Sequence, residues 1–415
     1  MKILHTSDWH LGHELYGNNR AEEQDSFLRQ IADIASKEQP DAMVVSGDIF
    51  HTSTPSIAAQ QLLTDGILRI HDACRRMQIV VTGGNHDSAS RLEIDSQLWK
   101  LAGVHVLGTL HRDANGRVNL DDHVITLPGK GIIVAIPHIY HANYPAVPDE
   151  ESVSREAAFF HSVMHEVNSR DTDGLPVVLM AHLAVQSMDG TGHRDADSDI
   201  GTMELLPIDT FGEGYDYLAL GHIHRPQTIR NTDGRIRYSG TPIEVSFDED
   251  YSHKVGGEQL HSVSIVEVEH GQRPVVTKVP IRNIHPLMTI PAEPVTFEEA
   301  IQTLENFPDD DPSYIRLNIL SSNGLPSDCN ARAAQAAENK ACQFCTFVIS
   351  VPNHSREHHR SWVQSRSSLD EFLHKGPMEV ADLYMAETGI SDADKASYRA
   401  LMSKTLDAIQ KEERM

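Results

Sequence analysis

Five short motifs carry the side chains in this sequence whose types and spacing could do chemistry. In chain order they are Asp8-Trp9-His10, Gly47-Asp48, Gly84-Asn85-His86-Asp87, Ala181-His182 and Gly221-His222-Ile223-His224. Their polar side chains are carboxylates, an amide and imidazoles, a ligand set without thiolate that favours manganese, iron or similar ions over a structural zinc. Two such ions about 3.5 to 4 Å apart can hold a phosphate and deprotonate a water. The motifs therefore predict a two-metal phosphoesterase site.

The spacing within the motifs suits the binding of cations. Asp8 and His10 are two positions apart, as are His222 and His224, so on extended backbone both side chains of a pair leave on the same side. A glycine before Asp48 lets the chain turn sharply, and the two oxygens of that carboxylate can bridge two cations. Any one of these residues alone would more readily be structural. Only the ordered set favours a metal centre.

His86 is placed for a different task. It follows Asn85, a neutral oxygen ligand, at a glycine-rich turn, and the metals do not need it as a ligand. A histidine in that place can protonate the leaving alkoxide or stabilise the charge that develops on the phosphate. His182 adds a further imidazole donor to the metals. Because the metals activate water, no protein nucleophile is needed.

Each motif ends a short apolar run, and these runs must position the polar side chains. The runs are residues 3–4, 42–45, 79–81, 177–180 and 217–220. Runs of this length, bounded by Gly, Asn and Asp, predict buried strands. Ligands of open α/β folds usually bind where such strands end. We therefore expect the motifs to converge on one edge of a sheet.

The alternation of strands with helical patterns predicts a layered α/β fold over the first part of the chain. Helical spacing of apolar residues covers 26–37 and 56–77. The later part, with runs at 131–136, 235–238 and 262–268, is richer in strands. A mixed sheet or a two-sheet sandwich therefore fits better than a purely parallel sheet.

Three domains are expected along the 415 residues: 1–282, 283–365 and 366–415. Prolines at 286, 291 and 294 suit a boundary, because they cannot continue a helix or a central strand. The second domain reads as a small α+β unit, with helices near 297–307 and 330–340 and strands at 314–320 and 344–351. The last domain reads as a helical tail, whose apolar stripe either packs on its own domain or docks another chain.

Composition limits the class of protein. No stretch is long and apolar enough to span a membrane, and four cysteines do not make a disulfide framework, so we expect a cytoplasmic protein. Zinc at Cys329, Cys342 and Cys345 with a histidine such as His354 is an alternative to reduced thiols. The net charge of −25 argues against a broad cationic surface for DNA. That objection weakens if bound cations or a partner subunit meet the phosphates.

The order of the motifs resembles that of the calcineurin-like metallophosphoesterases. Four segments look like one branch of that family, the SbcD-type nuclease subunits of bacteria, namely residues 6–12, 47–51, 84–87 and 238–243. The likeness is strong up to about residue 250. It is looser in the small domain, which would correspond to the capping domain of that family, and in the tail.

This resemblance implies roles for individual residues. One metal would be held by Asp8, His10, Asp48 and His224, and the other by Asp48, Asn85, His182 and His222, with Asp48 as the bridge. His86 would be the catalytic histidine, and His51 would help to place DNA or the transition-state phosphate. The metals would be Mn²⁺.

The resemblance also implies an assembly. The chain would form a homodimer within a heterotetramer, and its C-terminal helices would contact an SbcC-type ATPase. The sequence has no Gly-x-x-x-x-Gly-Lys-Ser/Thr loop, so ATP hydrolysis would belong to another chain. The complex would act on DNA as a double-strand exonuclease and a single-strand or hairpin endonuclease.

Two other functions stay open on the sequence. The same metals could act on a small phosphoester or a phosphoprotein, although the segment 240–242, the extra domain and the tail favour DNA. The chain could also be a scaffold that has lost catalysis, and the presence of His86 speaks against that.

Overall fold

Most of the first 351 residues are described by the computed structural model. The described ranges are 1–113, 118–145, 153–170, 172, 174–188, 205–249, 261–322 and 324–351, with the single positions 378, 395, 398, 399 and 402. The expected helical tail at 366–415 thus lies outside the described residues, apart from those single positions. Within the described ranges, every helix is too short or too polar to cross a lipid bilayer.

Two six-stranded sheets form the larger part of the molecule. The first, in the order β14-β13-β1-β4-β5-β6, consists of Val275–Pro280, Ser262–Glu267, Lys2–Thr6, Ala42–Ser46, Gln78–Thr82 and Val104–Leu107. The second, in the order β11-β12-β10-β9-β8-β7, consists of Gln227–Thr228, Ile236–Tyr238, Tyr217–Gly221, Val177–His182, Gly131–Ala135 and Val124–Leu127. In each sheet four neighbouring strands are parallel and the others pair antiparallel. The predicted mixed α/β architecture is confirmed.

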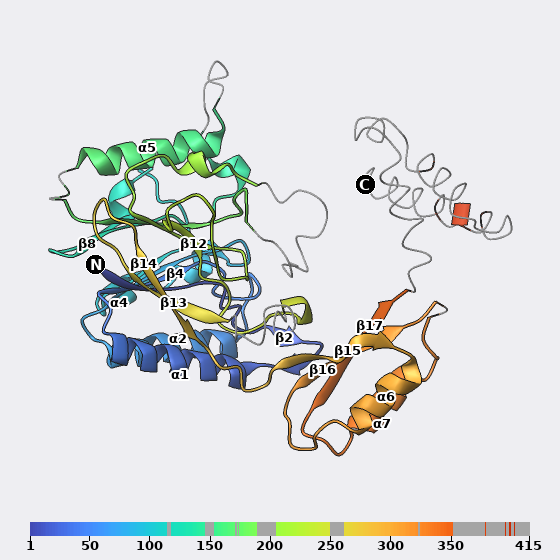
Figure 1. Ribbon diagram of the computed structural model, residues 1–415. Coiled ribbons are helices and arrows are strands. Elements are labelled where there is room, and N and C mark those ends of the chain that lie inside the picture. Colours follow the sequence, from blue (N-terminus) through green and yellow to red (C-terminus); the bar gives the residue numbers. More distant parts are fainter. Residues whose placement is uncertain are drawn as a thin grey trace.

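The sheets pack face to face, with helices on their outer faces (Figure 1). Alternation along the strands builds these layers: Ile3 and Val178 lie in the apolar cluster between the sheets, whereas Leu4 and Leu179 face outward. Helices α1 and α2 cover the first sheet and α5 covers the second. The helices are α1 (Ala21–Glu38), α2 (Ile57–Ala73), α3 (Ala89–Leu92), α4 (Ser96–Lys100) and α5 (Arg155–Ser169).

Short elements complete this two-sheet unit. They are the hairpin β2 (Glu14–Leu15) and β3 (Asn18–Asn19), and the 3₁₀ turns η1 (Leu120–Asp122), η2 (His141–Asn143), η3 (Ile208–Phe211) and η4 (Phe247–Glu249). Helix α1 begins five residues before the expected 26–37. Its first turn contains Glu23 and Gln24, which are both buried. Glu23 accepts a hydrogen bond from Arg20, and Gln24 accepts one from the backbone N–H of Gly12. A buried turn made of polar residues carries no apolar periodicity.

A three-stranded unit follows in the chain; it forms its own sheet beside the two larger sheets (Figure 1) and contacts them through a small apolar cluster. Its elements are β15 (Leu287–Val295), α6 (Phe297–Glu305), β16 (Tyr314–Leu320), α7 (Cys329–Ala337) and β17 (Gln343–Ser350). Thr296 and Glu299 form a capping box that begins α6. The apolar faces of both helices pack with the strands in one cluster. The strands are all parallel, which differs from the α+β expectation.

The proline-rich stretch 283–296 is only in part the boundary that we expected from the sequence. Residues 287–295 form β15, which contains Pro291 and Pro294. This strand lies at the edge of its sheet, beside the central β16, and its register shifts between Ile290 and Val295. An edge strand tolerates residues without an N–H because only one side must pair. Pro291 and Pro294 therefore belong to the three-stranded unit, and the chain passes from one unit to the other between β14, which ends at Pro280, and β15, which begins at Leu287.

Candidate metal centre

The five motifs lie at the carboxyl ends of β1, β4, β5, β9 and β10, and they meet where strand ends of the two packed sheets come together, not at one sheet. Glycines permit this approach. A Cβ on Gly221 would lie 1.7 Å from the carbonyl O of Ser46, and one on Gly84 would lie 2.1 Å from Asp48 Oδ1. Gly47 has φ +84°, and a Cβ there would meet the ring of His182. The strand ends therefore come together closely enough to share ions.

Asp8, His10 and His224 form one group of ligand atoms, all within 4.8 Å of one another. The Nε2 atoms of His10 and His224 are 3.1 Å apart. Asp8 Oδ1 accepts a hydrogen bond of 2.9 Å from the backbone N–H of His222, and Asp8 Oδ2 accepts from the hydroxyl of Ser7. This group joins residues from both sheets.

Asp48, His182 and His222 form a second such group. Asp48 Oδ2 lies 3.3 Å from His182 Nε2 and 3.8 Å from His10 Nε2, so this carboxylate lies between the two groups. Asn85 Oδ1 is 2.9 Å from His182 Nε2 and 3.1 Å from His222 Nδ1. The structure thus brings the seven residues that were predicted as ligands close together.

The backbone is strained at four of these residues. Asp8, His10, Asp48 and His222 have φ values of 54°, 45°, 52° and 96°, which is the region that favours glycine. Such a conformation costs on the order of 1–3 kcal/mol for each non-glycine residue and persists only where the surroundings enforce it. Strain at adjacent polar residues is typical of functional sites.

Burial and charge together set the protonation of the site. Burial raises the pKa of Asp8. Burial also acts on Asp48, but the neighbouring His182 and His10 hold the pKa of that carboxyl well below its usual range. Burial lowers the pKa of His10 well below its usual range, so this imidazole is neutral, as a metal ligand must be. Although burial opposes it, Asp48 raises the pKa of His182 to about 9, so a cation must displace that proton.

The residues fit divalent cations on two grounds. Asp48 Oδ2 is buried and accepts no hydrogen bond within the described residues; its nearest charge partners are the imidazoles of His182 and His10 at 3.3 and 3.8 Å, and a divalent cation that displaces the proton of His182 would compensate its charge instead. The donors are carboxylate and amide oxygens and imidazole nitrogens, which suit manganese and iron. The arrangement can therefore bind divalent metal ions.

His86 and His51 lie beside this group. The backbone N–H of His86 donates to Asp48 Oδ1 over 3.0 Å, and His86 Nδ1 lies 2.9 Å from the carbonyl O of His51, to which it donates. The two rings stack with 5.7 Å between their centres. Because Nδ1 keeps its hydrogen for His51, Nε2 is the atom of His86 that can gain or lose a proton.

Three residues of the site were given no role by the sequence analysis. Asp87 accepts hydrogen bonds from the backbone of Ile49, Phe50 and Gly84, and so ties the turn after β4 to the turn after β5. Its place in the third motif could have indicated this. Ser7 supports Asp8, and Glu249 lies 2.7 Å from His224 Nδ1. Glu249 follows its partner by 25 residues and has no local signal.

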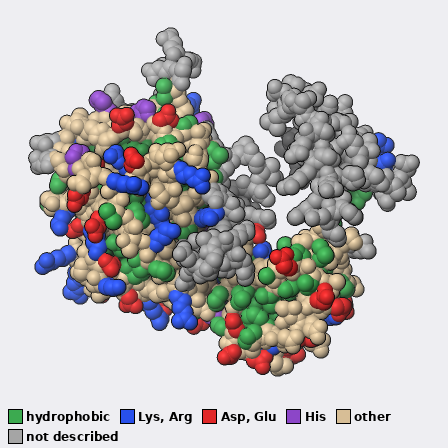
Figure 2. Space-filling view, viewed as in Figure 1, with side chains coloured by type: hydrophobic (Ala, Val, Ile, Leu, Met, Phe, Trp, Pro, Cys, Tyr) green, Lys and Arg blue, Asp and Glu red, His purple; other side chains and the backbone are tan. Residues whose placement is uncertain are grey.

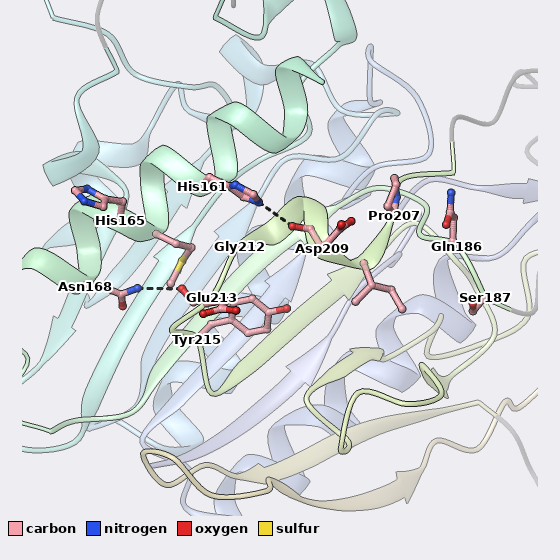
Figure 3. Close-up of a pocket in the computed structure, with 12 residues that line it drawn as sticks. His161, His165, Asn168, Gln186, Ser187, Pro207, Asp209, Gly212, Glu213 and Tyr215 are labelled. Atoms are coloured by element: carbon pink, nitrogen blue, oxygen red, sulfur yellow. Dashed lines mark hydrogen bonds between the residues drawn. The ribbon is translucent and has the colours of Figure 1, made fainter. Parts of the chain in front are cut away.

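Two other candidate sites offer less. All four cysteines are free, burial raises the pKa of Cys345 to about 11, and within the described residues no cysteine belongs to a ligand group. A cavity of about 930 Å³ lies between α5 and η3 (Figure 3). Its His161 Nε2 and Asn168 Nδ2 donate to backbone carbonyls, and it contains none of the predicted site residues.

Comparison with known proteins identifies the family of the chain. The family model of the calcineurin-like phosphoesterases matches residues 1–226. The SbcD chain of the SbcCD nuclease of Rhodobacter capsulatus is 34% identical over 71% of this chain and 72% of its own length. The SbcD chains of Bacillus subtilis (30%; 69% and 71%) and Escherichia coli K12 (26%; 78% and 79%) are also similar. The chain belongs to the calcineurin-like phosphoesterases, in the group of the SbcD nuclease subunits.

Proposed function

We propose that the chain is the manganese-dependent nuclease subunit of a complex that cleaves DNA. The observation that carries this proposal is the meeting of two ligand groups, Asp8 with His10 and His224, and Asp48 with His182 and His222, around the shared carboxylate of Asp48. The names of the similar proteins support DNA as the substrate. The activities are double-strand exonuclease and single-strand or hairpin endonuclease, in DNA repair, recombination and replication.

The seven ligands divide between two ions. The first ion takes Asp8, His10 and His224, the second takes Asn85, His182 and His222, and Asp48 serves both. When bound, two such ions lower the pKa of a water and neutralise charge on the phosphate. The donor set without thiolate supports Mn²⁺.

His86 moves the proton that the reaction needs. Its Nδ1–H donates to the carbonyl O of His51, and the backbone N–H of His86 donates to Asp48 Oδ1. These two hydrogen bonds fix the ring beside the metal centre. In its protonated form, Nε2 donates to the leaving oxygen of the DNA. His51 stacks on this ring and helps to place the phosphate.

DNA reaches this site with the help of other chains. On the face of the two-sheet unit that Figure 2 shows, Lys and Arg side chains are interspersed with Asp and Glu, and the chain carries a net charge of −25, which makes a weak surface for DNA. An SbcC-type ATPase supplies the missing basic surface in the bacterial cytoplasm, and the C-terminal region docks it. The three-stranded unit serves as the capping domain.

A second copy of the chain completes the assembly. Ile94, Leu98 and Leu101, in and around α4, are exposed to 80%, 66% and 87%. Three large apolar side chains exposed within eight residues favour a protein interface. We assign this surface to a homodimer within a heterotetramer.

The test compares substrates in the presence of Mn²⁺ and the ATPase partner. We expect cleavage of linear and hairpin DNA to exceed hydrolysis of an aryl phosphate, whereas inertness toward DNA with turnover of the aryl phosphate would support a small-molecule or phosphoprotein phosphatase. His86→Ala should lower DNA cleavage by about 10²- to 10⁴-fold, the usual contribution of a general acid, with metal content unchanged. The matched control is His165→Ala, since His165 is exposed on α5. Equal activity of the two variants would contradict the role of His86.

A further inference from the structure

A buried carboxylate contacts the side of the His224 ring that faces away from the metal centre. Its Nδ1 lies 2.7 Å from Glu249 Oε1, and both side chains are almost completely buried. Glu249 Oε2 accepts the backbone N–H of Val245 over 2.9 Å, so the carboxylate itself is fixed. The Nε2 of His224 then points to the opposite side, toward the Nε2 of His10 at 3.1 Å.

The backbone of His224 is fixed by the same segment of chain. The N–H of Thr241 donates to the carbonyl O of His224 over 3.0 Å. Gly240 lies so close that a Cβ there would be 2.5 Å from this carbonyl. Residues 239–249 thus hold His224 at its backbone and at Nδ1, which leaves its ring one orientation.

The turn that carries Glu249 also contacts the three-stranded unit. Asp248 Oδ1 accepts from Arg316 Nη1 of β16 over 2.8 Å, and the carbonyl O of Phe247 accepts from Arg316 Nη2 over 3.2 Å. The guanidinium lies 5.2 Å from the centre of the Phe247 ring, and Phe247 packs with Leu287 and Tyr314. The Arg316 side chain is 15% exposed, so this contact is largely shielded from water.

We propose that Glu249 is a positioning residue that orients His224 for its metal ion, and that the contact of Arg316 with η4 sets the position of Glu249. This inference rests on the proposed function. A carboxylate that accepts the Nδ1–H of an imidazole fixes the tautomer with Nε2 toward the metal, and loss of such a partner typically weakens metal binding by about 10–100-fold. The three consecutive residues Phe247, Asp248 and Glu249 therefore connect the position of the three-stranded unit with the orientation of His224, a ligand of one metal ion.

The first experiment measures Mn²⁺ binding to the full chain by calorimetry, for the wild type, Glu249→Gln and the control Glu269→Gln. Glu269 is an exposed glutamate that lies just after β13. Glu249→Gln should lower the affinity for one of the two Mn²⁺ ions by about 10-fold or more and leave the affinity for the other unchanged. In complex with the ATPase, kcat for DNA at fixed Mn²⁺ should fall while KM stays the same. Glu269→Gln should behave as the wild type.

The second experiment tests the link to the three-stranded unit. Arg316→Gln should lower the affinity for the same Mn²⁺ ion as Glu249→Gln does. The double variant Asp248→Arg with Arg316→Asp, which swaps the two charges, should restore part of that affinity. The control is Arg332→Gln, because Arg332 pairs with Glu298 on the surface of the same unit. If Glu249→Gln fails to fold, the Mn²⁺ affinity of Arg316→Gln alone tests the proposal.

The outcomes separate this inference from the proposed function. A wild-type chain that binds no Mn²⁺ would overturn the proposed function. A wild type that binds two ions, with Glu249→Gln binding both as tightly, would overturn only the role of Glu249. Weakening by Glu249→Gln without any change in Arg316→Gln would overturn the link to the three-stranded unit.

Discussion

Replacement of Gly221 by alanine should separate the two sheets at the point where the motifs meet. Gly221 ends β10, and its added Cβ would lie 1.7 Å from the carbonyl O of Ser46 at the end of β4. Ordinary C···O contacts are about 3.3–3.6 Å, so the strand ends must part by roughly 1.6 Å or more. Backbone cannot rotate away as a flexible side chain can. The hydrogen bond of 2.9 Å between His182 Nδ1 and Ser46 O must then break.

Two costs follow from this displacement. Overpacking of a close-packed interior costs about 1–3 kcal/mol. A buried carbonyl left without its partner costs about 1–3 kcal/mol more. The sum is at least about 2 kcal/mol, which lowers Tm by roughly 4–8 °C for a unit of this size. Because the ring of His182 loses its anchor, Mn²⁺ should also bind less tightly.

Scanning calorimetry gives Tm, and isothermal calorimetry gives Mn²⁺ affinity. The matched control is Gly129→Ala: Gly129 has φ +68° and no atom within 4 Å of an added Cβ, so it reports backbone strain alone. That strain costs about 1–2 kcal/mol and should leave Mn²⁺ affinity unchanged. Equal Tm and equal Mn²⁺ affinity in the two variants would refute the reasoning.

Three further predictions concern stability. Mn²⁺ at 100 times its Kd should raise the free energy of unfolding by about 2.7 kcal/mol, seen as a higher Tm that a chelator reverses; no shift would argue against binding to the folded state. Asp87→Asn should lower stability by about 1–3 kcal/mol in urea unfolding, because the carboxylate accepts three backbone N–H groups and an amide has one acceptor atom; exposed Asp65→Asn is the control, and equal midpoints would contradict this. Burial lowers the pKa of His5 to about 3. The unfolded chain therefore binds a proton below about pH 6.5 that the folded chain does not, and stability should fall by about 1.5 kcal/mol between pH 6.5 and 5, a loss that His5→Gln should lack. The same pH dependence in both proteins would count against this cause.

Local signals predicted much of the fold. Each motif follows an apolar run that is a strand, because a buried strand needs only a few β-formers and a glycine or polar residue at its end. The strand 314–320 was predicted with its observed bounds. Helix α1 was placed too late in the chain, since its first turn is buried through polar contacts of Glu23 and Gln24.

Long-range contacts could not be predicted in this way. The motifs meet between two sheets because β9 and β10 pair in a second sheet that faces the first, and no spacing in the sequence records that packing. The segment 240–242, which favours DNA on sequence resemblance, is placed by the fold against the backbone of His224, and Thr241 is fully buried. Glu249 is found only from its contact with His224.

Anomalous diffraction at the manganese edge, from crystals soaked in Mn²⁺, tests whether the seven side chains bind two ions. We expect two peaks about 3.5–4 Å apart, one beside Asp8, His10 and His224 and one beside Asn85, His182 and His222, with Asp48 between them. No peak among these residues under saturating Mn²⁺ would contradict the two-metal site and the chemistry built on it.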